Sequence, residues 1–118
     1  MESNKEIIRM RIYAGSTDKM DGKPVYESIV FKAKQMDLAG ATAFRGVMGF
    51  GASTVIHTSK LWELTEKLPI VVEIVDDKEK IMLFFESIKA GLDKMSKGCL
   101  VTIEKVEVLL YKAGDRTT

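Results

Sequence analysis

Apolar and polar side chains alternate over residues 7–14, where every second position from Ile8 is apolar and two arginines and a tyrosine lie between them. This period of two predicts a strand with one buried face. Residues 68–75 instead form a nearly continuous run of β-branched and aliphatic side chains, which predicts a central strand covered on both faces. Residues 41–45 and 99–111 favour two further strands.

Two segments carry apolar residues at the three- and four-residue spacing of a helix face. The first begins at Pro24, whose missing N–H costs nothing at the first helical position, and ends near Leu38, before Gly40. The second follows Asp76, which can accept from free helical N–H groups, and Glu79 would complete a capping box. The side chains expected to face the core are Tyr26, Ile29, Ala33 and Met36 in the first helix and Ile81, Phe85, Ile88 and Leu92 in the second.

The order of these elements is βαββαβ, that of a ferredoxin-like α+β fold with a four-stranded antiparallel sheet and two helices on one face. We expect a single domain over residues 1–118, with its core at about 7–111 and flexible ends. The second sheet face would remain bare and apolar. Because monomers rarely expose so large an apolar patch, this face predicts self-association.

Composition narrows the partners and the compartment. Lys+Arg 18 against Asp+Glu 17 gives a net charge of +1, which favours neither nucleic acid nor an anionic membrane as a partner. The single cysteine, Cys99, excludes an internal disulfide and suits the reducing cytoplasm. The amino terminus lacks the layout of a signal peptide, and no apolar stretch approaches membrane-spanning length, so we expect no direct membrane insertion.

The chain offers little for metal or acid–base chemistry. One histidine, one cysteine and acidic residues without ligand spacing cannot build a tetrahedral zinc site from one chain, although a trimer could gather three copies of one residue on its axis. Cys99 is far in sequence from His57, so we predict neither a resident metal nor an enzyme. His57 is interpreted as an exposed loop residue, with a ligand or partner contact as the alternative. Cys99 is interpreted as a small apolar packing residue rather than a reactive thiol.

The glycine-rich segment 45–51 is the candidate ligand site. Gly46, Gly49 and Gly51 would let backbone N–H groups approach an anion, and the guanidinium of Arg45 would bind phosphate or carboxylate. A bulge or tight turn is the structural alternative for these glycines. Lys94, near Lys97, could reach this segment from a neighbouring subunit, or could belong to a solvated basic turn.

Seven stretches of the sequence together resemble one known group, the PII-like domain-of-unknown-function 190 family. They are Arg11-Ile12-Tyr13, Asp18-Lys19, Gly22-Lys23-Pro24, Ala39-Gly40-Ala41-Thr42, Arg45-Gly46-Val47-Met48-Gly49-Phe50-Gly51, Ile56-His57-Thr58-Ser59 and the run 68–76. The resemblance covers about residues 7–111 and implies a ferredoxin-like fold assembled as a PII-like homotrimer. Asp18-Lys19 and Gly22-Lys23-Pro24 are a second candidate site, with a plain loop and helix start as the alternative.

The PII proteins that this family resembles bind adenine nucleotides between subunits and regulate transporters and enzymes through a long loop. Gly49-Phe50-Gly51 resembles the glycine-phenylalanine-glycine segment at the base of that loop, and Lys94 matches a phosphate-contacting lysine. The PII pattern also has two arginines at the end of its last core strand, where this chain has Val108 and Leu110. This departure leaves a nucleotide, another anion or no ligand open.

The resemblance therefore implies a PII-like signalling protein rather than an enzyme. We expect a small anionic effector, with a nucleotide as a candidate, to bind at Arg45, Gly46, Gly49, Gly51 and Lys94 between subunits. The 46–67 loop, with Thr54, His57 and Lys60, would contact a partner such as a membrane transporter or an enzyme. The alternative is a trimeric metal-handling or stabilising protein resembling the divalent-cation-tolerance relatives of PII.

Overall fold

The fold is that of a computed structural model, which describes residues 1, 5–51 and 68–115. Along the chain the elements are β1 (Ile7–Gly15), β2 (Lys19–Met20), β3 (Lys23–Pro24), α1 (Val25–Gln35), β4 (Thr42–Arg45), β5 (Pro69–Asp77), α3 (Lys78–Asp93) and β6 (Leu100–Lys105). Apart from the small β2–β3 hairpin, this is the predicted βαββαβ order. The hairpin was not predicted, because two strands of two residues leave no periodic pattern.

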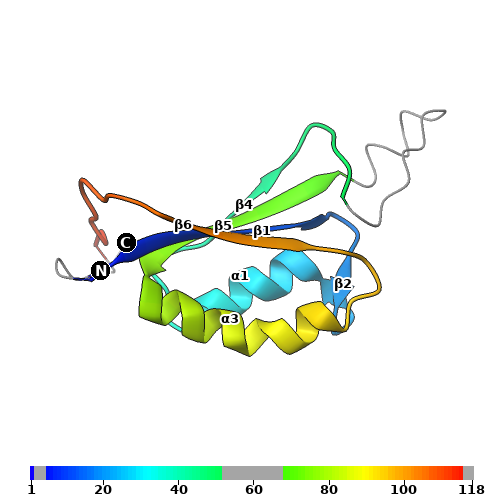
Figure 1. Ribbon diagram of the computed structural model, residues 1–118, viewed down its shortest axis with the longest axis horizontal. Helices are drawn as coiled ribbons and strands as arrows, with labels where there is room; N and C mark the ends of the chain where they lie inside the picture. The colour runs from blue at the N-terminus through cyan, green and yellow to red at the C-terminus, as the bar shows by residue number, and fades with distance from the viewer. Residues whose placement is uncertain (2–4, 52–67, 116–118) are drawn as a thin grey trace.

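The main sheet has the strand order β4-β5-β1-β6 among the described residues, and each neighbouring pair is antiparallel. Both helices lie on one side of this sheet (Figure 1). The α+β fold with a four-stranded antiparallel sheet and two helices is therefore confirmed. No helix in the described part of the chain is both long and apolar enough to cross a membrane.

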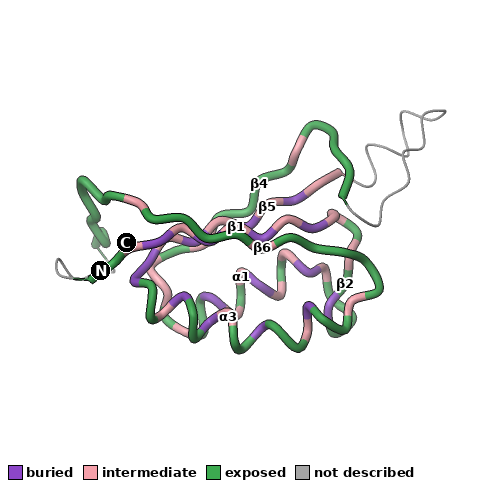
Figure 2. Tube along the Cα trace, viewed as in Figure 1, coloured by how far each residue is buried: buried purple, intermediate pink, exposed green. Residues whose placement is uncertain are grey.

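The core lies between the sheet and the helices, where buried positions alternate along β1 and β5 (Figure 2). Strand β1 contributes Ile8, Met10 and Ile12, as its alternating pattern predicted. Helix α3 turns Phe84 into the core and leaves Phe85 only partly buried, so the predicted face was wrong at that position. Adjacent residues are rotated by about 100° around a helix axis, so only one of the two phenylalanines can face the core fully. The three- and four-residue apolar spacing fits either of them.

Helix α1 buries Val25, Ile29 and Ala33, whereas Tyr26 and Met36 are partly buried at the edge of the core. The helix is shorter than expected and ends at Gln35, and Pro24 precedes it at the N-cap position. Strand β5 also differs from the prediction. Its exposure alternates, so one of its faces packs against the helices and the other remains partly open.

The start of α3 was also predicted wrongly. Strand β5 continues to Asp77, and Asp76 is a buried strand residue, 1% exposed, that does not cap the helix. One oxygen of its carboxylate accepts from the Ala39 N–H at 2.8 Å, and the other accepts from the Asp77 N–H at 2.7 Å. Lys80 Nζ lies 3.4 Å from the same carboxylate. The expected capping box is therefore replaced by a contact between distant parts of the chain.

Strand β6 ends at Lys105, so the expected strand over 99–111 is only half formed. The Val106 N–H still donates to the Ile7 carbonyl at 3.1 Å. Since Ile7 begins β1, the chain beyond Val106 has run past the end of its neighbouring strand. Residues 106–115 are consequently without regular structure.

Candidate functional site

Strand β4 carries the predicted ligand segment to the edge of the sheet. All of its residues, Arg45 included, are exposed. The Gly46 N–H donates to the Pro69 carbonyl at 2.7 Å, so this amide is engaged by β5. Figure 1 shows the segment after β4 at the edge of the sheet, well away from both helices.

The glycines of this segment are close to Pro69. A Cβ on Gly46 would lie 2.5 Å from Pro69 Cγ, and one on Gly49 would lie 3.3 Å from the same atom. Neither glycine has a positive φ, since positive values among the described glycines occur at Gly22 and Gly114. Space, rather than backbone conformation, explains the glycine at position 46, which supports its structural interpretation.

Lys94 lies at the C-cap of α3, where its N–H donates to the Ala90 carbonyl at 3.1 Å and its side chain is exposed. Figure 1 places this end of α3 on the helix side of the sheet, well apart from the segment that follows β4. One chain therefore does not bring Lys94 and Arg45 together. The predicted partner-contact residues Thr54, His57 and Lys60 lie outside the described residues, as does most of the 46–67 loop.

The second candidate, around Asp18, has a structural role in this chain. The Asp18 carboxylate accepts from the Gly15 N–H at 2.7 Å and closes the turn after β1. Met20 anchors the hairpin on α3, because a Cβ on Gly91 would lie 2.6 Å from its Sδ atom. The turn between β2 and β3 contains Gly22 with a φ of 79°. These contacts favour the interpretation as a loop and helix start.

Metal-ligating side chains do not gather in the described part of the chain, where no group of three His, Cys, Asp or Glu residues could hold an ion. Cys99 is exposed rather than packed in the core, so the packing interpretation was wrong. Partial burial of the thiol, followed by the charges of Asp93 and Asp18, raises the pKa of Cys99. A raised pKa lowers the thiolate fraction and argues against a reactive nucleophile.

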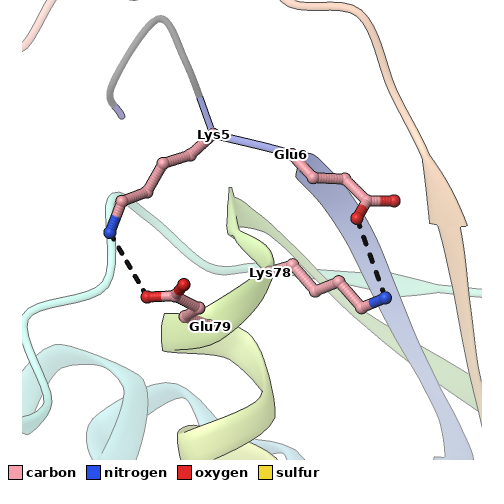
Figure 3. Close-up of a pocket in the computed structure, with 4 residues that line it drawn as sticks. All are labelled: Lys5, Glu6, Lys78 and Glu79. Atoms are coloured by element: carbon pink, nitrogen blue, oxygen red, sulfur yellow. Dashed lines mark hydrogen bonds and ion pairs between the residues drawn. The ribbon is translucent and has the colours of Figure 1, made fainter.

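A shallow hollow that the sequence did not indicate lies where the N-terminal segment crosses the start of α3. It has a volume of about 240 Å³ and is lined by Lys5, Glu6, Lys78 and Glu79. Figure 3 shows two ion pairs across it, Lys5 with Glu79 at 3.3 Å and Lys78 with Glu6 at 3.7 Å. Because these side chains neutralise one another, the hollow has no net charge to attract an anion.

The sheet face opposite the helices is mixed rather than uniformly apolar. Strand register places one row of apolar side chains across it, Phe44, Val71, Tyr13 and Leu100. The next rows are charged. Arg9 Nε donates to Glu104 at 2.9 Å, Arg11 Nε donates to Glu73 at 3.0 Å, and Arg11 Nη1 lies 3.6 Å from Glu104.

This charged network lowers the pKa of Glu104, chiefly through the hydrogen bond from Arg9. The hydrogen bond to Glu73 is the main cause that raises the pKa of Arg11. The expectation of a bare apolar face was therefore only partly right. Arginine and glutamate alternate with apolar residues along β1 and β5, and the sequence pattern did not reveal that they pair across strands.

Comparison with known proteins identifies the family. Residues 7–108 match the DUF190 family, described as an uncharacterised ACR. The chain belongs to the DUF190 family. A curated relative, a UPF0166 protein of Aquifex aeolicus (strain VF5), is 40% identical over 100 residues, which cover 85% of this chain and 90% of the relative. A second UPF0166 protein of that organism is 30% identical over 104 residues, covering 88% and 97% of the two chains.

Solved structures share the fold of this DUF190 chain at low sequence identity. A PII-like signalling protein described as putative, from Thermus thermophilus, has a TM-score of 0.57 at 16% identity and covers 86% of this chain and 88% of its own. CPII, a nitrogen regulatory PII-like protein from Thiomonas intermedia K12, has a TM-score of 0.59 at 12% identity, with the same coverages. The resemblance to the DUF190 family and the PII-like fold are confirmed.

Proposed function

We propose that this DUF190 chain is a PII-like regulatory protein that binds a small anionic effector between subunits of a homotrimer. The fold it shares with CPII supports the proposal. CPII structures are described as bound to ADP with bicarbonate, and to ADP and AMP with acetate. An adenine nucleotide, alone or with a small anion such as bicarbonate, is therefore the first effector to test.

Two exposed cations carry the proposal. Arg45 and Lys94 form no ion pair within the described residues, whereas Arg9, Arg11 and Lys78 are each paired. They lie at the ends of β4 and α3, too far apart to bind one anion in a single chain (Figure 1). A second copy could bring its Lys94 to the Arg45–Gly51 segment. The proposed site therefore requires assembly.

The site has few other groups that could bind phosphate. Gly46 already donates its N–H to Pro69, so the approach of the ligand to the backbone is proposed at Gly49, further along the segment. Arg45 would bind phosphate or carboxylate oxygens through paired N–H donors, and Lys94 would add a compact charge. The 46–67 loop that follows would transmit occupancy to a partner protein, for which a transporter or an enzyme is proposed.

Calorimetry and thermal unfolding with ADP and AMP, each with and without bicarbonate, test the ligand. A ligand that binds the native state raises Tm, because at a ligand concentration of 100 times Kd it adds about 2.7 kcal/mol to the free energy of unfolding. Lys94→Ala should abolish the rise, while Lys89→Ala, an exposed lysine on the same helix, should preserve it. No heat and no shift with any combination would overturn the nucleotide as effector.

Light scattering tests the assembly separately. A homotrimer should give a mass near three times 13.2 kDa at micromolar concentration. A folded monomer at that concentration would contradict both the trimer and the inter-subunit site. A trimer that binds no nucleotide would contradict only the choice of effector.

A further inference from the structure

Residues 106–111 form an apolar segment that, beyond the hydrogen bond from the Val106 N–H to Ile7, has no strand beside it in the described part of the chain. Leu109 is 99% exposed and Leu110 is 81% exposed, although both follow a strand directly. The segment lines one side of an open hollow of about 840 Å³, whose other wall includes Met1, Lys5, Glu6 and Ile7. Its valine- and leucine-rich sequence favours a strand. Such a strand needs a neighbour, and β1, which begins at Ile7, does not extend alongside these residues.

A matching edge lies on β4, whose outer side has no neighbouring strand among the described residues. Gly46 donates to Pro69, and hydrogen-bonded pairs alternate in an antiparallel ladder, so Phe44 and Thr42 exchange bonds with β5. The backbone N–H groups of Ala43 and Arg45 consequently point away from the sheet. Strands β5 and β1 separate β4 from β6 in the same chain, so the segment can reach such an edge only in another copy.

We propose that residues 106–111 of one copy add as a strand to the β4 edge of a second copy. Backbone hydrogen bonds would satisfy the outward groups of Ala43 and Arg45, and the leucines would leave water. The charges are complementary, since β4 carries only Arg45 and the segment carries only Glu107. The inference rests on the self-association in the proposed function.

This contact is heterologous, because each copy donates its segment at one edge and accepts another at the opposite edge. Such contacts close into rings when the rotation between copies permits, which agrees with a trimer. The outer edge of β6 is the competing donor. By the same alternation its outward N–H groups belong to Val101, Ile103 and Lys105.

Proline substitutions test the pairing, because proline removes an N–H while an outward edge position tolerates its ring. By the alternation that starts at Val106, whose N–H donates to Ile7 of β1, the N–H groups of Val108 and Leu110 face the side that β1 leaves open. Ala43→Pro therefore blocks the β4 edge and Leu110→Pro blocks the segment. Lys112→Pro, in the same irregular stretch, is the matched control, and Ile103→Pro blocks β6. Light scattering at micromolar concentration measures assembly, and circular dichroism verifies that each variant is folded.

We expect Ala43→Pro and Leu110→Pro each to lose the oligomer, and Lys112→Pro and Ile103→Pro to keep it. Mixing the first two should produce a dimer near twice 13.2 kDa, because one intact segment and one intact edge remain. A Leu110→Pro oligomer of wild-type mass would overturn the inference and leave the proposed trimer standing. Loss of assembly in Ile103→Pro alone would assign the contact to β6 and overturn it too.

Amide hydrogen exchange of the wild-type protein keeps the inference testable if a proline variant does not fold. Exchange at Leu110 and Ala43 should slow as protein concentration rises, since their N–H groups would bond only between copies. Exchange at Lys112 should not change. Equal, concentration-independent exchange at Leu110 and Lys112 in an assembled protein would refute the pairing, whereas a monomeric wild-type protein would contradict the proposed function itself.

Discussion

Substitution of Gly46 by alanine tests whether this glycine is required for packing. The new methyl carbon would lie 2.5 Å from Pro69 Cγ, whereas two carbon atoms prefer about 3.5–4.0 Å. Both residues are held in place, because the Gly46 N–H donates to the Pro69 carbonyl and Pro69 pairs with Gly15 of β1. One strand must therefore shift by about 1 Å.

Overpacking of this kind lowers the free energy of unfolding by about 1–3 kcal/mol. The lower entropy of alanine in the unfolded chain offsets about 0.4–1 kcal/mol of that loss. We therefore expect Gly46→Ala to lower the free energy of unfolding by about 1–2 kcal/mol. Gly40→Ala is the control, because a Cβ on Gly40 meets nothing within 4 Å and its φ is not positive.

Urea denaturation followed by circular dichroism, at one protein concentration, measures the difference as a shift in midpoint at constant slope. Pro69→Ala in the Gly46→Ala background should recover part of the loss by removing the clashing Cγ atom. Equal stability of the Gly46→Ala and Gly40→Ala proteins would refute the packing argument. The glycine would then have to be explained by close approach of a ligand to the backbone.

Two further predictions concern the core and the charged sheet face. Phe84→Ala should lower the free energy of unfolding by about 3–5 kcal/mol in the same urea assay, because Phe84 is fully buried; a loss below about 1 kcal/mol would contradict its place in the core. The hydrogen bond from Arg9 holds the pKa of Glu104 in the folded protein below its ordinary 4.5. The contribution of Glu104 to stability is therefore full above pH 4.5 and is lost as the pH falls through its pKa in the folded protein. Wild-type Tm should therefore exceed that of Glu104→Gln at pH 7 and approach it in acid; a Tm difference independent of pH would refute the pairing.

The sequence predicted the fold through its short-range periods and missed features that depend on distant partners. The alternation around Ile8 identified β1, because its pattern reflects a single buried face. Asp76 looked like a helix cap, since the sequence does not show that Ala39 would supply the hydrogen-bond donor. The predicted strand beyond Lys105 fitted its composition, but a strand also needs a neighbour, and β1 begins at Ile7.

The candidate site was predicted less completely than the fold. The glycine spacing identified a segment where the backbone approaches something closely, and at Gly46 that neighbour is the Pro69 ring. Sequence alone could not distinguish a proline from a phosphate, because both require the absence of a Cβ. Lys94 and Arg45 belong to one site only if another copy is present. The number of residues that separates them in the sequence does not show whether two copies bring them together.

The carboxylate of Asp76 has a consequence for how the molecule opens. It joins β5, in the second half of the chain, to the Ala39 N–H in the connection between α1 and β4. Releasing that connection would deprive a buried carboxylate oxygen of its backbone donor and leave it with Lys80 Nζ at 3.4 Å, at a cost of up to about 1–3 kcal/mol. Local opening of the first half is therefore coupled to loss of the second, and the two βα halves should behave as one cooperative unit in native-state exchange.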